Sequence, residues 1–421
     1  MTSANPLRIG IFTDDFYPES GGVSRSIQLQ LHVLAAAGHQ VTLFAPATQF
    51  TPPAECEWVR TPQWRLPGTP SYLCSLQVGT GLARRIAADH PRLDVVHSQN
   101  ERGSIFLTAL VAAELGIPQV HTFHSNYVGT HRTAAAAAAL NSFTYLDWSG
   151  RWLRRMRPAR QRRSFRPAAV QVPADEPALA GRDWRSLARL ASAVDRFTSP
   201  APFLVEGINA GSGGELSAFG QVVPSGVAEA FGRARRKRPR GPVTRFVSAG
   251  RLGPEKRVDV LLDAFELLAR DDAELHIIGS GGMERSLRQR AHRIRNGTVR
   301  FLGHFTDANL LAQELADADA FVLASYRFDT QGMVLAEAAA TRTPILYCDD
   351  RLTVGTSTDN ALLTGPSAAE LAAGMRELMD DPSRLESMSL ASAALGAKLG
   401  ADAMGQNYLN VYRAAIDDRS H

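Results

Sequence analysis

The chain has 421 residues, of which 44% are apolar, and 46 Lys and Arg stand against 42 Asp and Glu. This length exceeds a single small module and predicts two or more domains, while the ordinary globular composition excludes disorder of the whole chain. The net charge of +4 is too small to indicate a nucleic-acid-binding protein.

The first half of the chain alternates short β-branched segments with longer helical patterns. This alternation is typical of parallel sheets covered by helices on both faces, so we expect an α/β fold. The predicted strands are 8–13, 41–45, 94–97, 119–122, 196–199 and 221–224, and the predicted helices are 23–37, 103–115, 184–193 and 202–209.

A charged, Pro- and Gly-rich stretch without apolar periodicity, 231–242, is interpreted as an interdomain linker. It separates a first domain, 1–230, from a second domain, 243–400, each predicted to be doubly wound. A last helix, 401–421, has apolar residues at helical spacing and is expected to pack back on the first domain. The second domain is predicted to contain strands at 244–249, 274–278, 299–302 and 320–324, with helices over 258–269 and from Met283 and Ala308.

The protein is expected to be cytoplasmic and to touch membranes only peripherally. Its three cysteines include no Cys-x-x-Cys pair, and its first residues lack the pattern of a signal peptide. The longest apolar run, 105–113, is about half of the ~20 residues that a membrane-spanning helix needs.

Three glycine-containing turns follow predicted strands and are candidates for anion binding. Gly21 and Gly22 open a helix after the first strand, where backbone N–H groups and the helix dipole favour a phosphate. In the second domain, Arg251 and Lys256 suit a diphosphate, and Gly279 and Gly281 follow the next strand. The alternatives are a tight turn for the glycines and a solvated charge run for the cations.

Two carboxylates eight positions apart, Asp329 and Glu337, flank a Thr330-Gln331-Gly332-Met333 loop and the start of a helix. A carboxylate such as Glu337 can accept two hydroxyl hydrogen bonds from a ribose, although a capping residue and an ordinary helical Glu remain the alternative. We predict no metal site, and we interpret Asp317-Ala318-Asp319 as solvated turn residues.

Three histidines, His97, His121 and His124, stand at the ends of two first-domain strands. Histidine suits proton exchange or hydrogen bonding to a hydroxyl near neutral pH, so this group favours function over a structural role.

The segment 151–166 contains eight arginines and no acid, interleaved with Trp152, Leu153, Met156 and Phe165. This composition suits anionic lipid headgroups with an apolar face below them, and the alternative is a solvated basic loop. Together with the basic run 233–240 it holds fourteen of the 46 cations, so the remaining chain is net acidic.

Taken together, Gly21-Gly22-Val23-Ser24-Arg25, Gly250-Arg251 with Lys256, Gly279-Ser280-Gly281, the carboxylate pair and Thr343-Pro344 resemble the retaining GT-B glycosyltransferases. The family includes sucrose synthases, phosphatidylinositol mannosyltransferases and diacylglycerol glucosyltransferases. The resemblance implies two Rossmann-like domains facing a cleft, and transfer with retained configuration, without a metal or other cofactor.

By this resemblance, Arg251 and Lys256 would hold the donor diphosphate and Glu337 the ribose. Asp329 and the residues 330–333 would line the sugar pocket, and His124 would lie beside the reactive face of the sugar. The candidate catalytic set is therefore His124, Arg251, Lys256, Asp329 and Glu337, with Gly21, Gly22, Gly279, Gly281, Thr330, Gln331, Gly332 and Met333 as further donor-binding residues. Two departures are Asp329, where the family usually has Glu, and Arg342, where it usually has Gly and where we expect only an altered helix end.

The nearer likeness is to the diacylglycerol glucosyltransferase branch, through 97–101, 121–125 and Thr330-Gln331-Gly332. It implies transfer of glucose from UDP-glucose to diacylglycerol at the inner membrane face, with a nucleotide sugar, a lipid acceptor and an anionic membrane as partners. The residues assigned to the acceptor or membrane are His97, Glu101, His121, Arg154, Arg155, Arg162 and Arg163. The alternatives are a soluble or polysaccharide acceptor, a GDP-mannose donor, or a non-catalytic basic binding protein.

Overall fold

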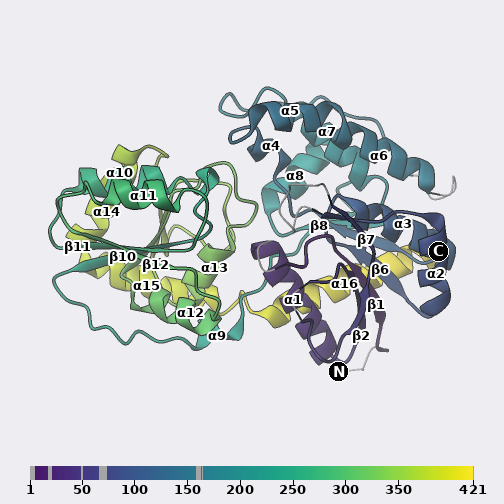
Figure 1. The fold of residues 1–421 in the computed structure, drawn as a ribbon, viewed down its shortest axis with the longest axis horizontal. Coiled ribbons are helices and arrows are strands. Elements are labelled where there is room, and N and C mark those ends of the chain that lie inside the picture. Colours follow the sequence, from purple (N-terminus) through teal and green to yellow (C-terminus); the bar gives the residue numbers. More distant parts are fainter. Residues whose placement is uncertain are drawn as a thin grey trace. The chain divides into compact units, whose positions relative to one another are not determined.

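The structure is a computed structural model that describes residues 5–17, 21–48, 51–65, 74–157, 163 and 165–420. The chain forms two compact units: unit 1 comprises residues 1–224 and 404–421, and unit 2 comprises residues 225–403. Figure 1 shows a sheet flanked by helices in each unit, so the predicted α/β fold class is confirmed.

Unit 1 is built on a parallel sheet of seven described strands in the order β3-β2-β1-β6-β7-β8-β9. The central strands are buried, and β1 packs Phe12 against Phe44 of β2 with ring centroids 4.2 Å apart, as expected where helices cover both faces. The strands are β1 (Arg8–Phe12), β2 (Gln40–Ala45), β3 (Glu57–Arg60), β6 (Val95–Ser98), β7 (Gln119–Thr122), β8 (Arg196–Ser199) and β9 (Gly220–Val222).

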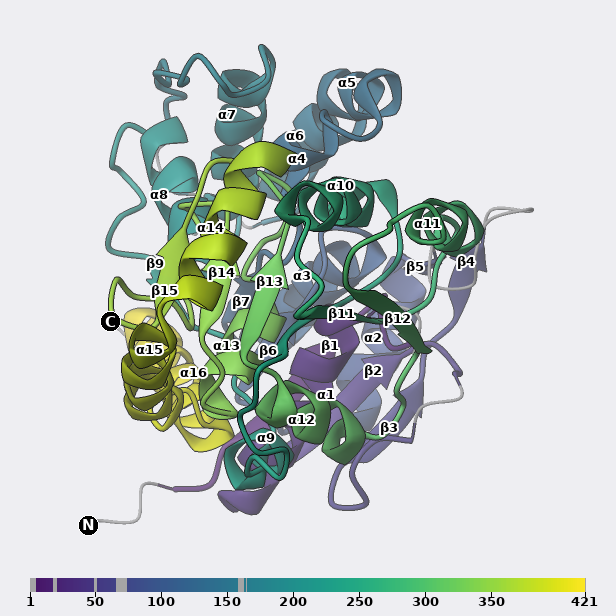
Figure 2. The ribbon, with the colours of Figure 1, turned by 90° about the vertical axis from the view of Figure 1, so that its left-hand side faces the viewer.

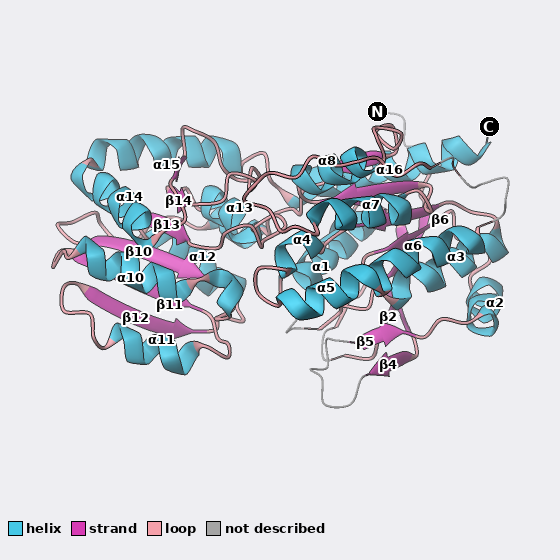
Figure 3. Cartoon of the chain, turned by 90° about the horizontal axis from the view of Figure 1, so that it is seen from above, coloured by secondary structure: helices cyan, strands magenta, loops and turns pink. Residues whose placement is uncertain are grey.

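The helices of unit 1 connect these strands and cover the sheet. A small antiparallel pair, β4 (Gln63–Arg65) and β5 (Cys74–Leu76), lies outside the main sheet (Figure 3). The helices are α1 (Gly22–Ala36), α2 (Thr80–Asp89), α3 (Gly103–Leu115), α4 (Tyr127–Thr130), α5 (Ala135–Phe143), α6 (Tyr145–Met156), α7 (Ala180–Ala191), α8 (Pro202–Gly211) and α16 (Ala401–Ser420).

The last helix, α16, contributes large side chains to the core of unit 1. Tyr408 and Tyr412 are buried, and the Gln30 amide nitrogen of α1 donates to the Tyr412 hydroxyl at 2.8 Å. Arg419, near the end of the helix, binds Asp195. Residues from both ends of the sequence therefore share one core.

Unit 2 is a parallel sheet of six described strands in the order β12-β11-β10-β13-β14-β15, the doubly wound order of dinucleotide-binding folds (Figure 2). Helices α10, α11 and α14 cover one face, and α9, α12 and α13 cover the other. The strands are β10 (Thr244–Ala249), β11 (Ala273–Ile278), β12 (Thr298–Gly303), β13 (Ala320–Leu323), β14 (Ile345–Tyr347) and β15 (Ala361–Leu363). The helices are α9 (Glu229–Arg233), the 3₁₀ turn η3 (Pro254–Lys256), α10 (Val258–Leu268), α11 (Glu284–Ala291), α12 (Ala308–Asp317), α13 (Met333–Ala340), α14 (Ala368–Asp380) and α15 (Pro382–Gly396).

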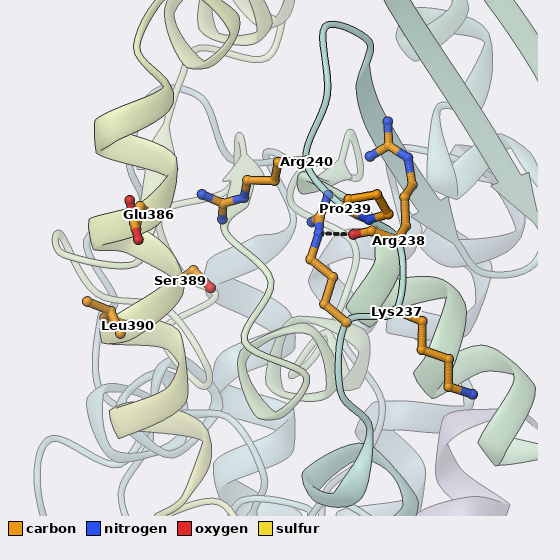
Figure 4. Close-up of a pocket in the computed structure, with 8 residues that line it drawn as sticks. Lys237, Arg238, Pro239, Arg240, Glu386, Ser389 and Leu390 are labelled. Atoms are coloured by element: carbon orange, nitrogen blue, oxygen red, sulfur yellow. Dashed lines mark hydrogen bonds between the residues drawn. The ribbon is translucent and has the colours of Figure 1, made fainter.

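The segment 231–242, predicted as a linker, instead belongs to unit 2, whose boundary with unit 1 falls between residues 224 and 225. Arg236 and Arg238 bind the carboxylate of Asp319, at 2.6 and 2.8 Å, which ties the basic run to the start of β13. Asp319 is 5% exposed, so it is a buried counter-charge rather than the solvated turn residue that we predicted. Beyond these pairs, 237–240 and α15 line an open surface groove (Figure 4).

Within the described ranges, none of the helices is both long enough and apolar enough to cross a membrane.

Candidate functional site

The donor-binding residues predicted in the second domain gather at the carboxyl edge of the unit 2 sheet. The strand order reverses direction between β10 and β13, and open α/β sheets bind ligands at such a point. Gly279 and Gly281 let the loops after β10 and β11 touch. A Cβ atom on Gly279 would lie 1.8 Å from the Gly250 carbonyl oxygen, and one on Gly281 would lie 2.5 Å from the Leu252 carbonyl oxygen. Both glycines are therefore required by the packing of this edge.

Lys256 and Asp329 meet at this edge. Lys256 ends η3, Asp329 lies in the loop between β13 and α13, and Lys256 Nζ donates to Asp329 Oδ1 at 2.5 Å. The two side chains are 19% and 11% exposed. Asp329 Oδ2 is buried and has no hydrogen-bond partner among the described residues. The pair thus combines an ammonium group, which suits a phosphate, with an oxygen that can accept from a hydroxyl group.

The other two charged donor residues differ in their exposure. Arg251 lies two residues after β10, its side chain is 55% exposed, and its Nε donates to Glu255 at 2.9 Å. Glu337 lies in α13 and is 2% exposed. Arg251 therefore presents its charge to solvent, whereas the side chain of Glu337 is buried.

The loop that carries Asp329 is fixed by its neighbours. The amide of Gln331 accepts from the backbone N–H of Ser225 at 2.8 Å and donates to the carbonyl oxygen of the same residue at 3.2 Å. The Gln331 side chain therefore anchors the loop, and its predicted donor contact stays a prediction. Gly332 has φ +68° and directly precedes α13, and Thr330 and Met333 are partly exposed.

Arg342, which stands where the resembling family usually has glycine, also has a left-handed backbone, with φ +65°. It lies just after α13, at a position where glycine commonly ends a helix because it lacks a Cβ atom. Arg342 therefore adopts the backbone conformation that glycine would adopt at this position, and the expected change at the helix end stays a prediction.

The sequence analysis missed two residues of this edge, Asp349 and Arg327. Asp349 follows β14 and is 1% exposed, and its Oδ2 accepts from the backbone N–H of Arg327 at 2.6 Å. A carboxylate two residues after a buried strand was the available signal, because the carboxyl ends of parallel strands share one edge.

In unit 1, Gly21 has φ +63° and precedes α1, so the predicted glycine turn opens a helix of fifteen residues. No side chain caps this helix, and the residues 18–20 before it lie outside the described residues. The predicted donor contact of Gly21 and Gly22 stays a prediction.

The three histidines are all buried, and burial lowers the pKa of each. His97 is fully buried, with Nδ1 2.7 Å from the Tyr412 hydroxyl and Nε2 2.7 Å from Thr122 Oγ1. It therefore joins α16 to the sheet, and its predicted contact with the acceptor stays a prediction. His121 is also fully buried, its Nδ1 lies 2.9 Å from Ser98 Oγ, and its pKa falls to about 3.

His124 is 8% exposed, and its Nε2 lies 2.7 Å from the side-chain oxygen of Gln99. Because an amide oxygen only accepts, this bond places the imidazole proton on Nε2 and makes Nδ1 the acceptor of the ring. Burial lowers the pKa of His124 to about 4, so the ring is neutral near pH 7 and suits hydrogen bonding rather than proton exchange.

Glu101 lies three residues after β6 and is 2% exposed. Its Oε2 accepts from Ser125 Oγ at 3.1 Å, and its Oε1 has no partner among the described residues. Burial raises the pKa of this carboxyl group to about 7. Glu101 therefore has an unused acceptor oxygen beside the residues that follow β7, consistent with a contact to a hydroxyl group.

The basic segment 151–166 is described at 151–157, 163, 165 and 166, so Arg162 lies outside the described residues. Arg154 Nη1 donates to Ser192 Oγ at 2.7 Å, and Arg163 Nη1 donates to the Val194 carbonyl oxygen at 2.7 Å. These two arginines bind inward, and their predicted contact with the acceptor or membrane stays a prediction. Arg155 is exposed, and its predicted contact with the acceptor or membrane stays a prediction.

Helices α5 and α6 expose a group of apolar side chains that the sequence analysis did not assign. Leu140, Phe143 and Trp148 are 66%, 55% and 50% exposed, and Trp148 stacks on Trp152 with centroids 5.0 Å apart. Arg151, three residues after Trp148, has a side chain that is 60% exposed. We call Leu140, Phe143, Trp148, Arg151 and Arg155 the α5–α6 surface.

No group of three or more His, Cys, Asp or Glu side chains in the described part of the chain is arranged to hold a metal ion.

Two family models match the chain, one in each unit. Residues 20–210 match the model described as Glycosyltransferase Family 4, and residues 243–381 match the model described as Glycosyl transferases group 1.

Among curated relatives, an α-monoglucosyldiacylglycerol synthase of Streptococcus pneumoniae is 31% identical over 128 residues, covering 29% of this chain and 27% of the relative. The alignment thus spans about a quarter of that relative. A GDP-mannose-dependent α-mannosyltransferase of Mycolicibacterium smegmatis is 27% identical over 82% of this chain and 80% of its own length.

Solved structures share the fold. HepE of Anabaena, in complex with UDP and glucose, superposes with a TM-score of 0.66 at 14% identity, over 97% of this chain and all of that one. Both halves of the chain thus match glycosyltransferase models, both sheets are doubly wound, and the relatives include glycolipid-forming enzymes. The chain belongs to the GT-B glycosyltransferase family that includes monoglucosyldiacylglycerol synthases and phosphatidylinositol mannosyltransferases.

Proposed function

We propose that the protein transfers glucose from UDP-glucose to a lipid such as diacylglycerol, with retained α configuration and without a metal. The observation that carries this proposal is the Lys256–Asp329 pair at the switch point of unit 2, with Arg251 in the same loop. In the proposed reaction these cations stabilise the negative charge that develops on the departing diphosphate.

Asp329 has an additional role in the proposed reaction. Its Oδ2 is buried without a partner among the described residues, so a sugar hydroxyl is the kind of donor that would satisfy it. Glu337 would hold the ribose. In unit 1, Glu101 and the neutral His124 would contact the acceptor hydroxyl group, and a phosphate oxygen of the leaving group would accept its proton.

The proposed lipid acceptor is supported by the similarity to a glycolipid synthase and by the α5–α6 surface. Aromatic and aliphatic side chains beside exposed arginines suit the boundary between anionic headgroups and acyl chains. A GDP-mannose donor is the second candidate, because the similarity to a GDP-mannose-dependent enzyme extends over 82% of the chain.

The donor and acceptor are tested by incubating the protein with radiolabelled UDP-glucose, UDP-galactose or GDP-mannose and vesicles that contain diacylglycerol. We expect label from UDP-glucose in the organic phase, and an Arg251→Ala variant should transfer far less because it lacks one diphosphate-binding cation. Label from GDP-mannose alone would establish the second candidate, and no transfer from any donor would contradict the proposed activity.

Membrane docking is tested with a Trp148→Ala/Arg151→Glu variant and vesicles containing phosphatidylglycerol. Each cation near an anionic surface contributes about 1 kcal/mol, so we expect vesicle binding to weaken at least about tenfold in co-sedimentation. Arg288→Glu is the matched control, since Arg288 is also a partly exposed helical arginine paired with an acid four residues earlier. Equal binding by the two variants would refute docking through the α5–α6 surface.

A further inference from the structure

Asp349 connects two loops at the carboxyl edge of unit 2. It follows β14 and is 1% exposed. Its Oδ2 accepts a hydrogen bond at 2.6 Å from the backbone N–H of Arg327, which lies in the loop after β13. The guanidinium of Arg351 binds both oxygens of the same carboxylate, at 3.1 and 3.2 Å. One buried carboxylate thus holds the backbone of the neighbouring loop.

The backbone of Arg327 needs this support, because it is left-handed with φ +57°. A residue with a Cβ atom occupies that region at a cost in free energy, and such strain persists where surrounding contacts determine it. The side chain of Arg327 adds an ion pair with Asp350 at 3.0 Å. Contacts of both the main chain and the side chain therefore stabilise the left-handed conformation of Arg327.

Arg327 lies two residues before Asp329, so its conformation directs the carboxylate that meets Lys256. On the Lys256 side, the next residue, Arg257, is also left-handed, with φ +50°, and its guanidinium donates to the carbonyl oxygens of Ala324 and Pro366. The guanidinium carbons of Arg257 and Arg327 lie 5.9 and 5.3 Å, respectively, from the centroid of the Tyr326 ring. Each member of the Lys256–Asp329 pair thus lies within two residues of an anchored, left-handed arginine.

We propose that Asp349 is a positioning residue of the donor site, which keeps Arg327 left-handed so that Asp329 faces Lys256. The proposal rests on the proposed function, because it assigns the loop 325–332 to donor binding. Asp349 itself is covered by Arg327 and Arg351, so it acts through the loop and not by contact with the donor.

The test compares Asp349→Ala with Asp349→Ala/Arg327→Gly and Asp349→Ala/Arg327→Ala. Both double variants lack the arginine side chain and differ only in the Cβ atom, which decides whether the left-handed backbone is strained. We expect Asp349→Ala to lower kcat/KM about 100-fold, mainly through kcat, because the displaced carboxylate of Asp329 no longer contacts the transition state. Arg327→Gly should recover at least about tenfold of this loss, and Arg327→Ala should recover none.

Hydrogen exchange gives a readout that does not depend on turnover. The peptide 325–332 should exchange faster in Asp349→Ala and regain protection with Arg327→Gly. Arg342→Gly, which relieves a left-handed arginine beyond α13, is the matched control and should rescue neither readout in the Asp349→Ala background. If Asp349→Ala does not fold, Arg351→Met is added to each variant, because it removes the guanidinium that has lost its Asp349 partner.

Equal recovery by Arg327→Gly and Arg327→Ala, or unchanged exchange of 325–332 in Asp349→Ala, would overturn the positioning role. A wild-type protein that transfers no sugar, but whose loop responds to these substitutions as expected, would instead refute the proposed function alone.

Discussion

Replacing Lys256 with alanine is expected to lower kcat/KM for hexose transfer by about 10²–10³-fold. A cation aimed at charge that develops in the transition state is worth this much when it lies in a partly dehydrated site. Lys256 meets that condition, because its side chain is 19% exposed and its ammonium group lies 2.5 Å from Asp329. The measurement is steady-state transfer from the nucleotide sugar identified by the donor panel.

A loss of folding must be separated from a loss of catalysis, because Lys256→Ala leaves the carboxylate of Asp329 unpaired and 11% exposed. The double variant Lys256→Ala/Asp329→Asn removes that unpaired charge, so it should melt closer to wild type while remaining inactive. Unchanged kcat/KM in a folded Lys256→Ala protein would contradict the assignment of the site.

The fold was largely predictable because its strands and helices carry strong local patterns. The helix 103–115 has the bounds that its apolar run predicts, and the central strands were located within one or two residues. The small pair β4 and β5 was missed, because each strand has only three residues and includes polar side chains.

The geometry of the site was less predictable because its contacts join distant parts of the chain. Lys256 and Asp329 are 73 residues apart, so the motif identified both residues but not their ion pair. His97 resembled a functional histidine, yet its partner Tyr412 lies 315 residues away on the last helix. Left-handed arginines such as Arg327 carry no local signal, since arginine is not a residue that favours φ > 0.

The availability of the cations in the two basic segments also depends on contacts between distant parts of the chain. Acid-free runs suggested free cations, but Asp319 neutralises Arg236 and Arg238 from another element. Arg157 of the other basic segment likewise binds Asp195 at 2.5 Å. Composition therefore locates excess charge, whereas tertiary contacts decide which cations remain available to a ligand or membrane.

Replacing Asp195 with alanine is expected to destabilise unit 1 by about 3–5 kcal/mol, because it leaves buried cations without their partner. Asp195 is 6% exposed and binds Arg157 at 2.5 Å, Arg419 of α16 at 3.0 Å and the backbone N–H of Gln119 at 2.8 Å. Urea unfolding of the full chain measures the loss, and hydrogen exchange of α16 should accelerate with it. Glu114→Ala is the control, since its pair with Arg84 is exposed and worth at most about 1 kcal/mol.

Asp195→Ala should also change how the free energy of unfolding depends on pH in the acid range. Burial alone would raise the pKa of Asp195, but Arg157 and Arg419 outweigh it and hold the pKa below its ordinary value of 3.8. A carboxyl group with a depressed pKa stabilises the fold above its unfolded pKa, and this contribution is lost as pH falls through the folded pKa. The stability difference between wild type and Asp195→Ala should therefore be constant near pH 6 and shrink below about pH 3.8. A difference that stays constant down to pH 2 would show that Asp195 stabilises α16 by packing and not by its charge.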